Sequence, residues 1–215
     1  MPLATTRRAG LVDQVIAQLR TAVGTEWPVG ARIPPEPELA ESLGVGRNTV
    51  REAVRALAHA GLLEVRQGDG TYVRATSEIS GALRRLAGTE LREILQVRRL
   101  LETEGARLAA LHRTPEDLAE LDRAMAACEA ADEPVAFAAA DLAFHRQVLR
   151  CAHNQVLAGL YAGLTEVVHA SVAAVAADGP FVCHTGLLAA IRAGDSDLAA
   201  AEAYDFLDTA LRLRE

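Results

Sequence analysis

Two groups of side chains in this 215-residue chain have the types and spacing to do chemistry. Asp141 and His145 are four residues apart, a spacing that puts both on one face of a helix within reach of a single cation. His184 comes from a separate segment and could close on them from across a helical bundle. An Asp–His pair on a helix is also a common hydrogen-bonded structural contact. The spacing alone therefore indicates either a metal site or a structural pair.

The second group is a row of arginines, Arg47, Arg51 and Arg55, which share one face of a predicted helix. Arg47 begins that helix, and the first residues of a recognition helix are the ones that reach base edges in the major groove of DNA. Asn48 and Thr49 beside it are residue types that read bases and bind phosphates. The alternative is an arginine face that only contacts water.

The elements around these arginines follow the order of a winged helix-turn-helix domain, which favours DNA binding. Apolar residues at three- and four-residue steps predict the helices, and alternating segments around a glycine turn predict a hairpin. The predicted elements are helices over 10–23, 36–43 and 47–60 and strands over 62–66 and 71–74. A tight turn at Val45-Gly46 separates the second helix from the third, and Gly61 ends the third.

The rest of the chain shows only helical patterns, so the predicted fold class is mainly α, with an antiparallel all-helical bundle after the winged helix domain. We expect a DNA-binding domain over 1–75, a linker over 76–90 with a short helix at 79–86, and an effector-binding and dimerisation domain over 91–215. Caps and prolines predict six helices in the last of these, over 91–112, 115–131, 134–152, 154–176, 180–194 and from 195 onward.

Charge and cysteine content fit this division. The net charge is −7, but residues 1–75 carry +1 and residues 76–215 carry −8, so the acidity belongs to the second domain. Three irregularly spaced cysteines favour reduced thiols in the cytoplasm over a disulfide framework. No apolar run is long enough for a membrane span, and we expect neither a signal peptide nor a membrane partner.

The first domain resembles the GntR family of transcription regulators. The resemblance lies in Ile33 to Ala40, in Leu43 to Ala53, in Leu57 to Leu63 and in the wing Gln67-Gly68-Asp69-Gly70-Thr71-Tyr72-Val73. It implies that Arg47 and Arg51 contact base edges and phosphates of double-stranded operator DNA. It also implies that the wing tip around Gln67 and Gly68 enters the minor groove.

The second domain resembles the FCD effector-binding domain of the FadR subfamily, in its six-helix, VanR-like form. The resemblance lies in Glu93 to Glu102, in Asp141 to His145 followed by Asn154, and in His184 with Ile191 to Asp195. The resemblance implies that Asp141, His145 and His184 are ligands of a divalent metal such as Zn²⁺, Ni²⁺ or Mn²⁺, as the residues at these places are in metal-containing members. The fourth expected ligand is replaced by Phe206. The departure leaves either three ligands with open positions or a site that has lost its metal.

The same resemblance points to residues that would bind the effector. An arginine near Arg98 pairs with the effector's carboxylate in similar domains, and the planar guanidinium suits that group. The alternative for Arg98 is an internal salt bridge to Glu102, one turn later on the helix. His169 is a second candidate for the pocket.

The function expected from these features is a ligand-responsive transcription regulator that is not an enzyme. A homodimer would bind a palindromic operator, and a small carboxylate-bearing effector would release this repressor from DNA. Two alternatives stay open. One is a metal-dependent enzyme domain fused to a DNA-binding module, and the other is a nucleoid-type DNA binder with no effector.

Overall fold

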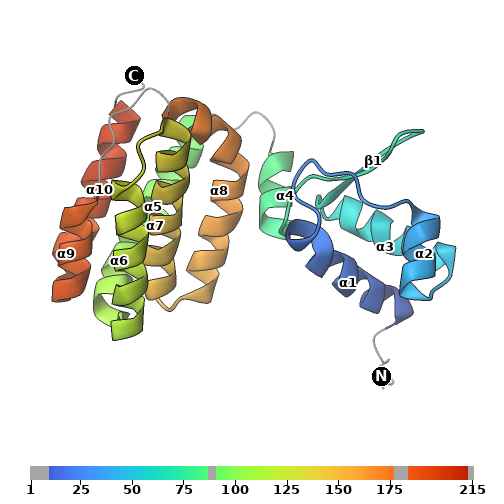
Figure 1. Cartoon of the computed structure of the whole chain (residues 1–215), viewed down its shortest axis with the longest axis horizontal. Helices are drawn as coiled ribbons and strands as arrows, with labels where there is room; N and C mark the ends of the chain where they lie inside the picture. The colour runs from blue at the N-terminus through green and yellow to red at the C-terminus, as the bar shows by residue number, and fades with distance from the viewer. Residues whose placement is uncertain (1–9, 87–90, 177–183, 213–215) are drawn as a thin grey trace, which may run out of the picture. The chain divides into compact units, whose positions relative to one another are not determined.

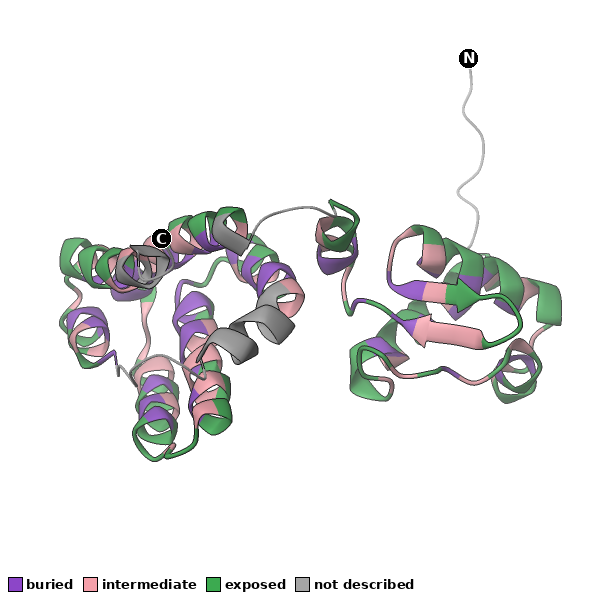
Figure 2. Ribbon diagram, turned by 90° about the horizontal axis from the view of Figure 1, so that it is seen from above, coloured by how far each residue is buried: buried purple, intermediate pink, exposed green. Residues whose placement is uncertain are grey.

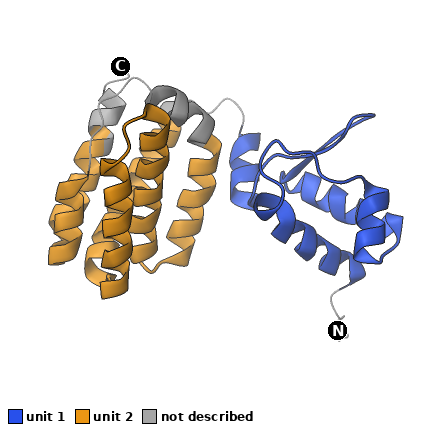
Figure 3. Cartoon of the chain, viewed as in Figure 1, with its two compact units in different colours: residues 1–87 blue, residues 88–215 orange. Residues whose placement is uncertain are grey.

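The computed structural model describes residues 10–86, 91–176 and 184–212, which fold into two compact units (Figure 3). Unit 1 comprises residues 1–87 and unit 2 residues 88–215. The described part is mainly helical, with one small hairpin (Figure 1). The predicted fold class is confirmed.

Unit 1 is a winged helix-turn-helix domain. Its elements are α1 (Leu11–Thr25), α2 (Glu36–Leu43), α3 (Arg47–His59), β1 (Leu63–Arg66), β2 (Gly70–Val73) and α4 (Glu78–Arg85). The two strands pair antiparallel, from Leu63 opposite Val73 to Arg66 opposite Gly70, and so form the wing. Gly44 ends α2 in the left-handed region at φ 65°, which glycine adopts without strain and which allows the sharp turn into α3.

The buried side of α3 fixes which of its residues remain outside. Its inward residues recur at helical spacing and are each at most 2% exposed: Val50, Ala53, Val54 and Leu57. They pack with Val15 and Leu19 of α1 in one core cluster. Because this stripe faces the core, Arg47, Arg51 and Arg55 lie on the opposite, exposed side.

The short helix that we expected within the linker, α4, belongs to unit 1. A Cβ atom on Gly81 would lie 2.8 Å from the carbonyl oxygen of Ala60, so this helix approaches the end of α3 backbone to backbone. Arg85 donates to the carbonyl of His59, and Glu78 forms an ion pair with Arg20 of α1. These contacts hold α4 against the C-terminal end of α3.

Unit 2 is a bundle of helices. They are α5 (Leu91–His112), α6 (Pro115–Glu129), α7 (Pro134–Cys151), α8 (Gln155–Ala176), α9 (Thr185–Ala193) and α10 (Ser196–Arg212). Pro180, where we expected the fifth of these to begin, lies outside the described residues, and the described helix begins at Thr185. Thr114 caps α6 by accepting from the backbone N–H of Asp117.

The core of unit 2 lies along the inward faces of these helices, where Figure 2 shows buried positions facing one another. Its largest buried members include Phe144, Leu149, Tyr161 and Ile191. α5 packs against α7, α8, α9 and α10, so side chains on its inward face meet residues that are distant in sequence. No helix in the described ranges is both long and apolar enough to span a bilayer.

Candidate functional site

The exposed start of α3 carries the residues predicted to contact DNA. Arg47, Asn48 and Arg51 are exposed, and Thr49 is half-buried. The preceding residue, Gly46, is extended and caps the helix without a side-chain hydrogen bond. Such a helix start combines side-chain donors with the positive end of the helix dipole, and both attract phosphate.

Arg51 has a carboxylate partner that sequence reasoning missed. Its Nε lies 3.0 Å from Oε2 of Glu36, in the first turn of α2, and its side chain is 48% exposed. In the part of the chain that the structure describes, no ion pair is found for Arg47 or Arg55. These two arginines therefore offer positive charge that is not already compensated, whereas the charge of Arg51 is shared with Glu36.

The wing tip carries Gln67 and Gly68, both exposed, with Gly68 at φ 78° in the turn between the strands. Arg66 stacks over the ring of Tyr72 with its guanidinium carbon 4.3 Å from the ring centroid. Arg32 also lies against the wing, because a Cβ on Gly70 would come within 2.5 Å of its Nε. Arg32 and Arg66, which we had not predicted, therefore lie at the wing, and the charge of Arg66 is shared with Glu64 and Asp69, 3.3 and 3.9 Å away.

In unit 2 the structure brings the three predicted metal ligands together. Asp141 and His145 project from α7, and His184 is the residue immediately before α9. Nε2 of His184 lies 2.7 Å from Oδ1 of Asp141 and 3.1 Å from Nε2 of His145, and the third separation, His145 Nε2 to Asp141 Oδ1, is 3.5 Å. The two histidines are 1% and 6% exposed.

A tetrahedral ion bound at about 2.0–2.2 Å holds its ligand atoms roughly 3.3–3.6 Å apart. The 3.5 Å between His145 Nε2 and Asp141 Oδ1 lies in that range, whereas the other two separations, 2.7 and 3.1 Å, are hydrogen-bond distances, so the three donor atoms would have to move apart to hold a cation. Of the residues that the structure describes, these three form the one group of three or more metal-ligating side chains whose donor atoms lie within 4.8 Å of one another. Two imidazoles and a carboxylate fit Zn²⁺, Ni²⁺ or Mn²⁺.

Glu102, which sequence reasoning treated only as a partner for Arg98, also lies against one of the candidate ligands. Its Oε2 is 2.9 Å from Nδ1 of His145, an ion-pair distance without hydrogen-bond geometry, and Nε2 of the same ring faces Asp141 and His184. A carboxylate beside the second nitrogen is a common feature of metal-binding histidines. The signal that could have found it is the position of Glu102 on the inward face of the predicted first helix.

The charges in this cluster shift several pKa values. Burial lowers the pKa of His145, but the carboxylates of Glu102 and Asp141 outweigh it and raise the pKa to about 9. Burial and the charge of His145 lower the pKa of His184. Burial raises the pKa of Glu102, but Arg98 and His145 outweigh this and hold it at about 2. Burial raises the pKa of Asp141, but the charges and hydrogen bonds of His145 and His184 outweigh this and lower it, so both carboxylates are negative at neutral pH. The raised pKa of His145 favours its protonated form, and a bound cation would have to displace that proton.

Phe206 of α10 lies where the resemblance leads one to expect a fourth ligand. Its ring centroid is 4.2 Å from that of His184, with the two rings perpendicular, and 5.7 Å from that of His145. The ring of Phe144 stacks on that of His184, with the two ring centroids 5.4 Å apart. The cluster is thus bounded by two apolar rings, and neither of them carries a lone pair that a metal could accept.

Arg98 forms the internal salt bridge that was the alternative to its role in effector binding. Its Nε pairs with Oε1 of Glu102, which also accepts from the hydroxyl of Tyr161 at 2.7 Å. Arg98 is 6% exposed, yet its Nη2 has no hydrogen-bond partner in the described structure. The salt bridge therefore leaves one buried donor of this guanidinium available to another acceptor.

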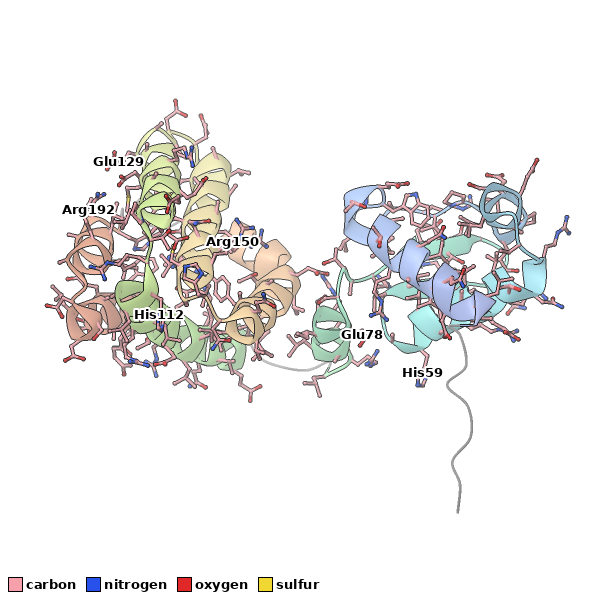
Figure 4. The ribbon with its side chains drawn as sticks, turned by 90° about the horizontal axis from the view of Figure 1, so that it is seen from below. His59, Glu78, His112, Glu129, Arg150 and Arg192 are labelled. Atoms are coloured by element: carbon pink, nitrogen blue, oxygen red, sulfur yellow. The ribbon has the colours of Figure 1, made fainter. Side chains whose placement is uncertain are left out.

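His169, the second residue predicted for the effector pocket, is in α8, but its side chain lies outside the described residues. Two other histidines lie elsewhere. His112 is exposed at the end of α5 (Figure 4), and His153 contacts Asp117 with its Nε2 2.7 Å from Oδ2. Neither belongs to the cluster of Asp141, His145 and His184.

Comparison with known proteins gave two family matches and several relatives. Residues 11–73 match the model described as bacterial regulatory proteins, gntR family, and residues 93–209 match the FCD domain. The chain is similar to the Uxu operon transcriptional regulator of Escherichia coli, at 36% identity over 69% of this chain and 61% of that protein. It is also similar to the "Probable D-xylose utilization operon transcriptional repressor" of Paenarthrobacter nicotinovorans, at 35% identity over 80% of this chain and 74% of that protein.

Among solved structures, the chain is similar to the protein titled Streptococcus agalactiae GntR, at 28% identity with a TM-score of 0.56. That match covers 94% of this chain and 100% of the solved one. Against several curated relatives the aligned part is shorter, and the chain spans 58% to 66% of their length.

Proposed function

This chain belongs to the GntR family of bacterial regulatory proteins and carries an FCD domain, and from that premise we propose that it is a repressor of transcription released from its operator by a small organic acid. The observation that carries the DNA-binding half of the proposal is the exposed start of α3, where Arg47 and Asn48 project beside an arginine row. The wing supplies a second contact through Gln67 and Gly68. Two relatives whose printed names describe operon regulators support the same role.

The chain would act on DNA as a homodimer. One winged helix contacts few base pairs, so a dimer on a palindromic operator is the arrangement that gives sequence specificity. The outer side of α8 supports such pairing. This helix packs mainly against α5 and α7, yet Glu166 is the one Asp, Glu, Lys or Arg among its 22 residues. Val156 and Leu160, one turn apart, are 72% and 42% exposed. A second copy would cover that surface.

The effector would bind beside the cluster of Asp141, His145 and His184. These residues would hold a divalent metal, which would supply a Lewis-acidic anchor for a carboxylate. Arg98 would contribute its unpartnered Nη2, while Glu102 holds its Nε and is itself held by the hydroxyl of Tyr161. Because effector and operator act on the same molecule, an effector that weakens DNA binding must itself be bound less tightly by the DNA-bound form.

Replacing Arg47 with alanine tests the DNA-binding role. We expect the variant to bind operator about 5- to 150-fold more weakly, since a base-contacting arginine contributes roughly 1–3 kcal/mol. The measurement is a binding titration with the DNA that flanks the gene, at a fixed salt concentration. Arg123→Ala, which removes an exposed arginine of α6, is the matched control and should bind as the wild type does.

A second substitution on the same surface should change operator affinity in the opposite direction. Glu36→Gln releases Arg51 from its ion pair and removes a negative charge beside the DNA-binding face, so we expect tighter binding. Unchanged affinity in both Arg47→Ala and Glu36→Gln would refute the assignment of α3 as the recognition helix.

The pairing surface has its own test. Leu160→Glu would bury a charge at the proposed interface in each copy. We therefore expect the dissociation constant of the dimer to rise at least about tenfold. Sedimentation velocity over a range of protein concentrations measures this. Leu198→Glu, on α10 and 47% exposed in the wild type, is the control and should sediment as the wild type does. A Leu160→Glu variant that remains dimeric would exclude this face of α8.

A further inference from the structure

A third extended segment runs beside the wing hairpin and adds a side chain to it. Residues 30–33 pair with β2, where the backbone N–H of Ile33 donates to the carbonyl of Thr71 at 2.9 Å. Arg32 and Tyr72 are opposite each other in an antiparallel bridge between the two segments. The chain just before α2 is therefore joined to the wing by backbone hydrogen bonds, and the position of Arg32 is tied to that of β2.

The side chain of Arg32 lies on the face of the wing that points away from the core. Opposite residues of an antiparallel ladder share a face, and the next residue along the strand points to the other face. Ile33 is 3% exposed in the core of unit 1, whereas Arg32 is exposed. A Cβ on Gly70 would lie 2.5 Å from Nε and 3.1 Å from Cζ of Arg32. The guanidinium therefore rests against the backbone at the start of β2, at the base of the wing tip.

The charge of Arg32 differs from that of the other arginines of the wing. Nε of Arg66 lies 3.3 Å and Nε of Arg74 2.6 Å from the same oxygen, Oε2 of Glu64. For Arg32, in contrast, neither an ion pair nor a side-chain hydrogen bond is found within residues 10–86, 91–176 and 184–212. Its positive charge is therefore available to an anion that approaches the wing.

We propose that Arg32 binds a backbone phosphate of the operator at the edge of the groove that the wing enters, and so holds the wing in place on the duplex without reading its sequence. The inference rests on the proposed function, because it concerns the same DNA. The minor groove is only about 6 Å wide and is flanked by both phosphate backbones. With Gln67 and Gly68 of the tip inside it, a cation at the base of the tip meets phosphate rather than base edges.

The contact of Arg32 with Gly70 favours this role. A free arginine side chain loses much rotamer freedom when it binds a phosphate, and that loss weakens binding. Because the guanidinium already rests against the backbone of β2, part of this freedom is lost before DNA arrives. The planar group can then form charge-assisted hydrogen bonds to phosphate oxygens.

The test measures how DNA affinity depends on salt concentration, because each phosphate contact releases counterions and so contributes to that dependence. The full-length wild type, Arg32→Gln, Arg32→Lys and the control Arg123→Gln are titrated at several salt concentrations. Each is titrated with the DNA that flanks the gene and with an unrelated duplex of the same length. Thermal unfolding of the Arg32 variants should match that of the wild type, which excludes loss of the fold as the cause of any effect.

We expect Arg32→Gln to reduce the slope of log affinity against log salt by about 0.9 for each bound copy of the chain. At about 0.1 M salt this corresponds to roughly fivefold to tenfold weaker binding per copy, and by the same factor for both duplexes. Arg32→Lys keeps the charge and should retain most of the slope. Arg123→Gln, which removes an exposed charge of α6, should match the wild type.

Three results would overturn the inference: a wild-type slope in Arg32→Gln, an equal loss of slope in Arg32→Lys, or weaker binding that is confined to the flanking DNA. The last would mean that Arg32 reads bases or only orders the tip. Failure of the repressor proposal looks different, because the wild type would then bind both duplexes alike. If the wild type prefers the flanking DNA and Arg47→Ala weakens that binding while Arg32→Gln changes nothing, only the role of Arg32 is refuted.

Discussion

Replacing Glu102 with leucine is expected to destabilise unit 2 by about 3–5 kcal/mol, the cost of removing one partner from a buried ion pair. Glu102 is 1% exposed and contacts Arg98, His145 and Tyr161. Its removal leaves the guanidinium of Arg98 buried without a counter-charge and the hydroxyl of Tyr161 without its acceptor. The free energy of unfolding, followed by urea titration with a probe in unit 2, measures the loss.

Two further variants identify the cause of that loss. Glu104→Leu, two residues along the same helix, removes a glutamate whose pair with Arg107 is largely exposed, and it should cost less than about 1 kcal/mol. The double variant Arg98→Met with Glu102→Leu removes both charges and should recover part of the stability. If Glu102→Leu is no more harmful than Glu104→Leu, the buried network contributes little to the fold.

The winged helix domain could be predicted closely because its signals are local. The apolar stripe of α3, the left-handed Gly44 and the glycine turn of the wing are each encoded within a few neighbouring residues. The same stripe that buries Leu57 places Arg47 on the outside. The placement of α4 could not be predicted in this way. It packs against the end of α3 because Gly81 approaches the backbone of Ala60, a contact between residues about 20 positions apart.

The candidate site was predictable only in part, because its members are joined by tertiary packing. Asp141 and His145 share a helix face, and this follows from their spacing. The approach of His184, 43 residues from Asp141, was suggested by family resemblance and could not be derived from periodicity. The contacts of Glu102 with His145 and of Glu36 with Arg51 depend on which side chains meet across packed helices. A sequence pattern predicts which side of a helix faces the core, but it does not predict which side chain of another helix will contact that side.

Replacing His145 with alanine is expected to abolish metal binding while operator binding by metal-free protein is retained. His145 supplies one of three donors, and removal even of a residue that only orients a metal ligand typically costs 10- to 100-fold in affinity, so loss of a ligand should cost at least about 100-fold. Zn²⁺ at 100 times its wild-type Kd should stabilise the wild type by about 2.7 kcal/mol and the variant hardly at all. Elemental analysis and thermal unfolding with and without Zn²⁺ measure both effects.

Because His145 is buried, its loss also removes one of the three partners of Glu102 and leaves a cavity, so stability falls for a reason unrelated to metal. Asp141→Asn separates the two causes, since it removes a ligand charge from a side chain that is not part of the Glu102 contact while keeping its shape. It should lose Zn²⁺ binding with a smaller change in stability. His153→Ala, which removes an exposed histidine, should behave as the wild type does. If Zn²⁺ stabilises all three variants equally, the histidines and aspartate of this cluster form a hydrogen-bonded core contact rather than a metal centre.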